Sequence, residues 1–131
     1  MKKAGILNQP ISGLIAGMGH TDSLVVSDAG LPIPEGPARI DLAVSCGLPP
    51  FREVLAAILG DLQVERAVLA EQTRRQRPEL HEIILDMLGD VQVDYLDHEE
   101  LKERSARARG IVRTGECTPF ANVILYSGVV F

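Results

Sequence analysis

The sequence contains no tryptophan, and aromatic residues make up only 4% of its 131 positions. The hydrophobic fraction is an ordinary 46%, so the core must be built mainly from Val, Ile, Leu and Ala. Such a core suits alternating strands and helices better than a groove for flat apolar ligands. The chain also lacks the ~20 apolar residues that cross a bilayer and the apolar segment of a secretion signal. We therefore expect a soluble, cytoplasmic protein that does not associate with membranes.

A long basic surface is also absent. The formal net charge is −5, and the arginines form only two short clusters. These clusters are Arg74, Arg75 and Arg77, and Arg104, Arg107 and Arg109. Both are typical of solvated faces or subunit contacts, because a nucleic-acid footprint needs a larger basic patch. We expect no nucleic-acid partner.

The common motifs for binding phosphates, nucleophiles and metals are missing too. Neither a phosphate-binding glycine loop nor a nucleophile elbow is present. The histidines His20, His81 and His98 lack close carboxylate neighbours of the kind a metal site needs, so no metal is expected. Cys46 and Cys117 are far apart and have no metal-type spacing. They are predicted to be buried thiols in a reducing compartment.

Apolar periodicity divides the chain into short alternating helices and strands. Helices are predicted at residues 9–18, 51–59 and 78–88 and from residue 97 onward. Strands are predicted at residues 24–27, 39–44, 65–70, 92–96, 110–113, 122–126 and 129–131. This alternation predicts an α/β fold in which residues 1–131 form a single compact three-layer domain. The sheet should be mostly parallel, with helices on both faces.

Residues 19–34 are the best candidate for a site that binds a small polar ligand. They include the short buried strand, with His20 before it, Asp28 after it and a stiff Gly-Leu-Pro-Ile-Pro exit. His20 follows the end of the first helix, where the helix dipole favours a cationic histidine that can give a proton. Asp28 lies at the carboxyl end of the strand, where open α/β sheets bind ligands. It can equally be a turn aspartate that accepts from the backbone of residues 29–30.

Two more polar residues fall at the start of the helix that follows Asp97. His98 comes directly after this N-cap, and Lys102 lies one turn later on the same side. From spacing alone, a structural role for His98 and a solvated role for Lys102 are favoured over ligand binding. His81, within the third helix, is expected to have a surface or structural role.

Several short motifs occur in order from one end of the chain to the other. In the first half they are Lys2-Lys3, Gly5-Ile6-Leu7-Asn8, Gly19-His20-Thr21-Asp22, Asp28-Ala29-Gly30-Leu31-Pro32-Ile33-Pro34 and Arg39-Ile40-Asp41-Leu42. In the second half they are His98-Glu99-Glu100, Arg113-Thr114-Gly115-Glu116, Thr118-Pro119-Phe120-Ala121-Asn122 and Gly128-Val129-Val130-Phe131. Taken together, these motifs resemble the ribose pyranase / L-fucose mutarotase family, and the Ala-Gly-Leu-Pro-Ile-Pro run is similar to its ribose branch.

The resemblance implies a cofactor-free isomerase of ribose catabolism that interconverts the pyranose and furanose rings of D-ribose. It implies that His20 is the catalytic acid and that Asp28, His98 and the segment Phe120-Ala121-Asn122 bind the sugar. Lys102 matches a lysine common in the same site. A homo-oligomer is also implied, a decamer of two stacked pentamers with sugar sites near subunit boundaries. Histidine suits this chemistry because ring opening delivers one proton to the ring oxygen and removes another from the anomeric hydroxyl.

The chain departs from the family pattern at Phe120, where tyrosine is usual. The missing hydroxyl predicts weaker sugar binding or slower ring exchange, because one hydrogen bond is lost. Three alternatives to a ribose pyranase stay open. The protein can be a mutarotase for another sugar such as L-fucose, a catalytically weakened sugar-binding protein, or a ring-shaped scaffold that binds no sugar.

Overall fold

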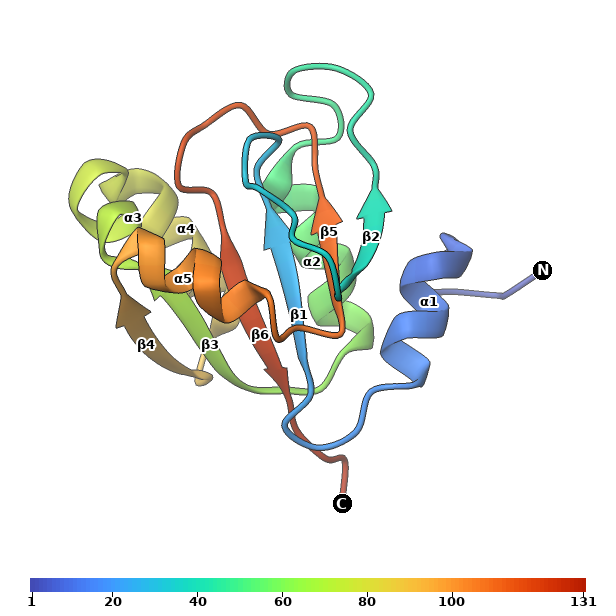
Figure 1. Ribbon diagram of the computed structural model, residues 1–131. Coiled ribbons are helices and arrows are strands. Elements are labelled where there is room, and N and C mark those ends of the chain that lie inside the picture. The colour runs from blue at the N-terminus through green and yellow to red at the C-terminus, as the bar shows by residue number, and fades with distance from the viewer.

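A computed structural model describes all 131 residues and contains a six-stranded sheet with the strand order β2-β5-β1-β6-β3-β4 (Figure 1). The strands are β1 Ser23–Ser27, β2 Ala38–Asp41, β3 Val64–Ala70, β4 Gln92–Leu96, β5 Gly110–Arg113 and β6 Val123–Ser127. The helices are α1 Gln9–Ala16, α2 Phe51–Asp61, α3 Glu71–Gln76, α4 Pro78–Leu88 and α5 His98–Ser105. Strand β6 alone runs antiparallel to its neighbours β1 and β3, and the other three pairings are parallel. The predicted α/β class and mostly parallel sheet are confirmed.

The interior strands are apolar on both faces because helices cover both. In β1, Leu24 and Val26 belong to the larger core cluster, whereas Val25 belongs to the smaller one. Helices α1, α2 and α4 contribute to the larger cluster, and α5 covers the opposite face through the fully buried Leu101. Figure 1 shows this arrangement, with α5 in front of the sheet and α2 behind it. The three-layer prediction is therefore confirmed.

Local sequence signals place several element boundaries. The side chain of Asn8 accepts the Ile11 N–H at 3.0 Å and begins α1, with Pro10 in its first turn. The side chain of Asp97 accepts the Glu99 N–H at 3.0 Å and begins α5. Strands β4 and β5 have the bounds that the apolar pattern predicts. No helix has the length and apolar character needed to span a membrane.

Two elements differ from the sequence-based expectation. Helix α3 has no counterpart among the predicted elements, because it is almost wholly polar and buries only Thr73. The predicted strand at residues 129–131 is wrong, since these residues pair with no strand and lie exposed at the C-terminus. Apolar character alone is therefore insufficient to make a strand when no sheet edge is within reach.

The cysteine prediction is also wrong. Cys46 and Cys117 are exposed and form a disulfide, with their Cα atoms 5.6 Å apart. The two residues are separated by 71 positions but lie in loops that follow the neighbouring strands β2 and β5 and meet at the carboxyl ends of those strands. Backbone hydrogen bonds from Gly47 N–H to Gly115 O and from Gly115 N–H to Pro49 O join the same loops. A pairing of this kind depends on topology, which the spacing of the cysteines does not reveal.

Candidate active site

An open cavity of about 450 Å³ lies where β1 and the loop before β6 meet at the carboxyl edge of the sheet. Its lining residues come from three segments: Asp28–Leu31 after β1, His98 at the start of α5, and Glu116–Phe120 between β5 and β6. Carboxyl edges of this kind are where α/β sheets bind ligands. The cavity thus brings together three of the predicted site residues, Asp28, His98 and Phe120.

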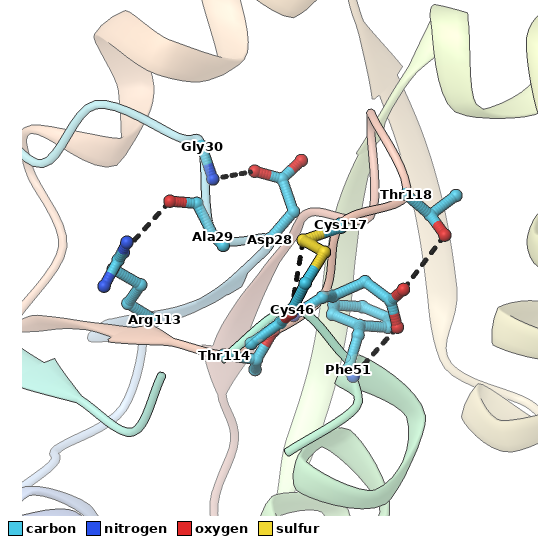
Figure 2. Close-up of a disulfide and its surroundings, with 11 residues drawn as sticks. Asp28, Ala29, Gly30, Cys46, Phe51, Arg113, Thr114, Cys117 and Thr118 are labelled. Atoms are coloured by element: carbon cyan, nitrogen blue, oxygen red, sulfur yellow. Dashed lines mark hydrogen bonds between the residues drawn. A yellow bond between two sulfur atoms is a disulfide. The ribbon is translucent and has the colours of Figure 1, made fainter. Parts of the chain in front are cut away.

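Asp28 is held rigidly by Asn122, which the predictions also include. The fully buried Asn122 accepts the Asp28 N–H through Oδ1 and donates through Nδ2 to Asp28 Oδ2, both at 3.0 Å. The other carboxylate oxygen, Oδ1, accepts the Gly30 N–H at 2.9 Å (Figure 2). Asp28 is therefore both the turn aspartate and a residue of the cavity wall, so the two interpretations of its position are compatible. Each oxygen keeps lone-pair capacity for a ligand hydroxyl.

The loop that follows Asp28 is tied to the end of β5. The Arg113 guanidinium donates to Ala29 O at 3.0 Å (Figure 2). It also pairs with Asp41 at 3.0 Å. The Ala29 N–H in turn donates to Glu116 O at 2.8 Å. The hydrogen bond from the Ala43 N–H, together with the bond from Arg113, lowers the pKa of the Asp41 carboxyl. These contacts fix the cavity wall on the side of β1.

His98 and Phe120 form the opposite side of the cavity. Their rings meet edge to face, with centroids 5.0 Å apart, and Phe120 has a left-handed backbone with φ of 69°. This conformation is uncommon for an aromatic residue and is often found at functional sites. Thr73 secures it by donating from its hydroxyl to Phe120 O at 2.8 Å. The Nδ1 atom of His98 is buried and has no hydrogen-bond partner in the chain.

The backbone N–H of His98 is bound within the chain and does not face the cavity. Its N–H donates to Gln72 Oε1 at 3.0 Å, and Gln72 Nε2 donates to Asp97 at 2.8 Å. This bond from Gln72, followed by that from the Glu99 N–H, lowers the pKa of the Asp97 carboxyl. Helix α3 therefore positions the start of α5, where His98 lines the cavity.

Besides Asn122, the predicted residues Ala121 and Lys102 do not line the cavity. Ala121 is fully buried between Phe120 and Asn122. Lys102 pairs through Nζ with Glu99 at 2.8 Å, in agreement with a solvated lysine on a charged helix. The structure of this chain does not bring Lys102 into the cavity wall. His81 is buried and bonds through Nε2 to the Tyr95 hydroxyl at 2.6 Å, as a structural histidine does.

His20 lies at the opposite end of strand β1 from Asp28. The two residues flank β1, whose five residues span about 16 Å at ~3.3 Å per residue. His20 sits in a turn after α1, where its Nε2 is 2.9 and 3.0 Å from the carboxylate oxygens of Glu65. The helix ends at Ala16, so Glu65 rather than the helix dipole is the nearest charge. Both side chains are about half exposed, at 53% and 45%.

The bond to Glu65 determines which nitrogen of His20 is free. A carboxylate only accepts hydrogen bonds, so Nε2 carries a proton, and Nδ1 is the nitrogen that Glu65 does not hold. This is the arrangement of an acid–base group oriented by a carboxylate.

Comparison with known proteins then identifies the family. The model of the RbsD / FucU transport protein family matches residues 1–130. The chain belongs to this family. Among curated relatives, a D-ribose pyranase from Symbiobacterium thermophilum is 55% identical over 131 residues, and both chains are covered in full. A D-ribose pyranase from Geobacillus thermodenitrificans is 50% identical and covers 100% of this chain and 99% of its own.

Solved structures of RbsD / FucU proteins share the fold. Bacillus subtilis RbsD complexed with D-ribose is 40% identical, with a TM-score of 0.97 and full coverage of both chains. The fucose mutarotase from Streptococcus pneumoniae in complex with L-fucose is 26% identical, with a TM-score of 0.75 and 95% coverage of each chain. The fold is thus shared with proteins that bind two different sugars.

The sequence analysis does not predict a role for three residues of the candidate site. Glu116 lines the cavity, accepts the Phe51 N–H at 3.1 Å and accepts the Thr118 hydroxyl at 2.9 Å (Figure 2). Glu65 and Gln72 hold the two histidines His20 and His98. Glu65 and Gln72 are distant in sequence from the histidines that they hold. The one available signal is the motif around Glu116, which the family resemblance includes.

Proposed function

We propose that this protein is a D-ribose pyranase, a cofactor-free isomerase that interconverts the pyranose and furanose rings of D-ribose. The observation that carries the proposal is Asp28, which Asn122 braces and which lines one cavity together with His98 and Phe120. The 55% identity to a D-ribose pyranase over the whole chain supports it. Cofactor-free chemistry suits the task, since ring opening of a hemiacetal needs only proton transfers.

The side chains at the cavity suit the binding of sugar hydroxyls. The Asp28 carboxylate accepts hydroxyl protons, and Asn122 fixes it in position. His98 lines the cavity with Asp28, and a histidine ring can hydrogen-bond a sugar hydroxyl. The ring of Phe120 packs against the apolar face of the sugar. Ala121 joins Phe120 to Asn122 along the chain. Lys102 lies one turn along α5 from His98 and is expected to complete the site.

His20 supplies the acid–base group from a neighbouring copy of the chain. Within one chain it lies a full strand length from Asp28, too far for both to touch one ribose. In a homo-oligomer the exposed His20–Glu65 edge of one copy packs against the cavity of the next. His20 then protonates the ring oxygen while the anomeric hydroxyl loses its proton, and the open aldehyde recloses through another hydroxyl. The family pattern favours a decamer of two stacked pentamers that acts in ribose catabolism in the cytoplasm.

Magnetisation-transfer NMR of equilibrated D-ribose tests the function. We expect the protein to accelerate pyranose–furanose exchange, and to accelerate exchange of L-fucose anomers much less. Greater acceleration with L-fucose would instead favour the mutarotase alternative, which the likeness to the fucose mutarotase supports. Saturable ribose binding without acceleration would favour a weakened sugar-binding protein.

Phe120→Tyr is expected to strengthen ribose binding or accelerate exchange by roughly two- to tenfold, because a neutral hydrogen bond contributes about 0.5–1.5 kcal/mol. The new hydroxyl extends the ring that already lines the cavity. Titration calorimetry and the NMR exchange rate measure the two effects. Phe120→Leu, which lacks both ring and hydroxyl, is the control and should weaken binding. Equal affinity and rate for the Tyr variant and the unmodified chain would contradict the prediction.

A further inference from the structure

The disulfide between Cys46 and Cys117 lies at the rim of the sugar cavity. Cys117 is one of the lining residues, whereas Cys46 belongs to the loop between β2 and α2 and does not line it. Figure 2 shows the sulfur atoms at the same edge of the sheet as Asp28 and Thr118. Both cysteines are exposed, so small thiols and disulfides in solution can reach them. Nothing in the proposed isomerase chemistry uses either sulfur.

The part of the cavity wall formed by residues 115–120 is anchored by hydrogen bonds on either side of Cys117. Before it, Gly115 bonds to the backbone of the loop at residues 47–49, and Glu116 accepts the Phe51 N–H. After it, Phe120 O accepts the Thr73 hydroxyl. Between these points, Thr118 bonds through its hydroxyl to Glu116 within the same loop. The disulfide is therefore the one covalent or hydrogen-bonded link between residues 117–119 and a distant part of the chain.

We propose that Cys46 and Cys117 are a site of reversible thiol–disulfide exchange with low-molecular-weight disulfides, and that the disulfide organises the wall of the sugar cavity. In the oxidising direction, one cysteine thiolate attacks the small disulfide and releases one small thiol. The second cysteine then attacks the mixed disulfide and releases the other, so that the protein loses two protons and two electrons and the small disulfide gains them. Exposure and the 5.6 Å Cα separation permit both directions without rearrangement of the backbone.

Reduction should loosen the cavity wall without unfolding the protein. The hydrogen bonds of Gly115, Glu116 and Phe120 remain, so the loop stays in place at both ends. Residues 117–119 gain freedom that sugar binding must remove. Ordering a side chain on binding costs about 0.5–1.5 kcal/mol, so we expect the ribose Kd to rise by roughly two- to tenfold on reduction.

The experiment compares the full-length protein equilibrated with glutathione disulfide and with a phosphine reductant. Intact mass after thiol alkylation reports the disulfide, and hydrogen exchange of residues 115–121 reports the wall without any sugar. Titration with D-ribose reports the affinity. We expect complete interconversion of the two forms, faster exchange of these amides in the reduced form, and the weaker ribose binding given above.

Cys46→Ser is the matched control, since it removes the disulfide and leaves the cavity lining intact. Its ribose affinity and hydrogen exchange should equal those of the reduced protein and should not respond to the reductant. Failure of glutathione disulfide to re-form the disulfide in the reduced, folded protein would overturn the proposal. So would equal hydrogen exchange of residues 115–121 in the two forms. This inference rests on the proposed sugar site, but the thiol and exchange measurements decide it even if ribose fails to bind.

Discussion

His20→Ala is expected to reduce the acceleration of ribose ring exchange by about 100-fold or more, since a positioned acid–base group typically contributes that much. The substitution removes the ring whose Nε2 is bound to Glu65 and whose Nδ1 is free. The side chain is half exposed and in no core cluster, so the fold should be unaffected. NMR exchange rates measure the effect, and circular dichroism verifies the fold.

His20→Gln separates proton transfer from the loss of a contact. Its amide can still donate to Glu65 but cannot exchange a proton at neutral pH. We expect this variant to be as inactive as His20→Ala while it keeps the same oligomeric state by gel filtration. Ring exchange that stays fast in both variants would show that another group supplies the proton.

Mixing two inactive variants tests where His20 acts. Asp28→Asn should bind ribose poorly, because it removes the carboxylate that lines the cavity. If His20 of one copy completes the cavity of another, oligomers reassembled from equal amounts of His20→Ala and Asp28→Asn regain about a quarter of the native sites. If both residues serve one site within a chain, the mixture stays inactive. The separation of the two residues along β1 makes recovery the expected result.

The parts of the fold that follow from local sequence were predicted well. Strands β4 and β5 and the start of α5 depend on apolar alternation and an N-cap, and these signals act over a few residues. Helix α3 was missed because its stability comes from tertiary contacts, including the Thr73 hydroxyl on Phe120 O. The disulfide was missed for the same reason, since its cysteines meet only after the sheet has formed.

The same difference between local and long-range signals holds for the residues of the candidate site. Asp28 was found from its place at the end of a buried strand, a position fixed by local pattern and topology. Its brace, Asn122, is 94 positions away and was named through the family resemblance alone. Glu65, 45 positions from His20, was not named at all. Sequence pattern therefore locates the ends of strands, whereas the partners that orient a catalytic group depend on which strands become neighbours.

Asn122→Ala is expected to destabilise the protein by about 2–4 kcal/mol and to weaken ribose binding at least tenfold. Asn122 is completely buried, and Asp28 is only 8% exposed. The substitution leaves the Asp28 N–H and one carboxylate oxygen without their partners in a site that water scarcely reaches. An unsatisfied buried polar group costs about 1–3 kcal/mol. Chemical denaturation and calorimetric titration with ribose measure the two effects.

Asn122→Asp distinguishes the two hydrogen bonds that join these residues. It keeps an oxygen for the Asp28 N–H but replaces the Nδ2 donor by a second carboxylate at hydrogen-bonding distance from Asp28. Two carboxylates this close raise the pKa of one of them, because they cannot both ionise cheaply. A raised pKa in the folded state favours folding at low pH, so this variant should regain stability relative to the unmodified chain as the pH falls. Equal stability of both variants and the unmodified chain at neutral pH would show that Asn122 does not brace Asp28, and the sugar site would then need another support.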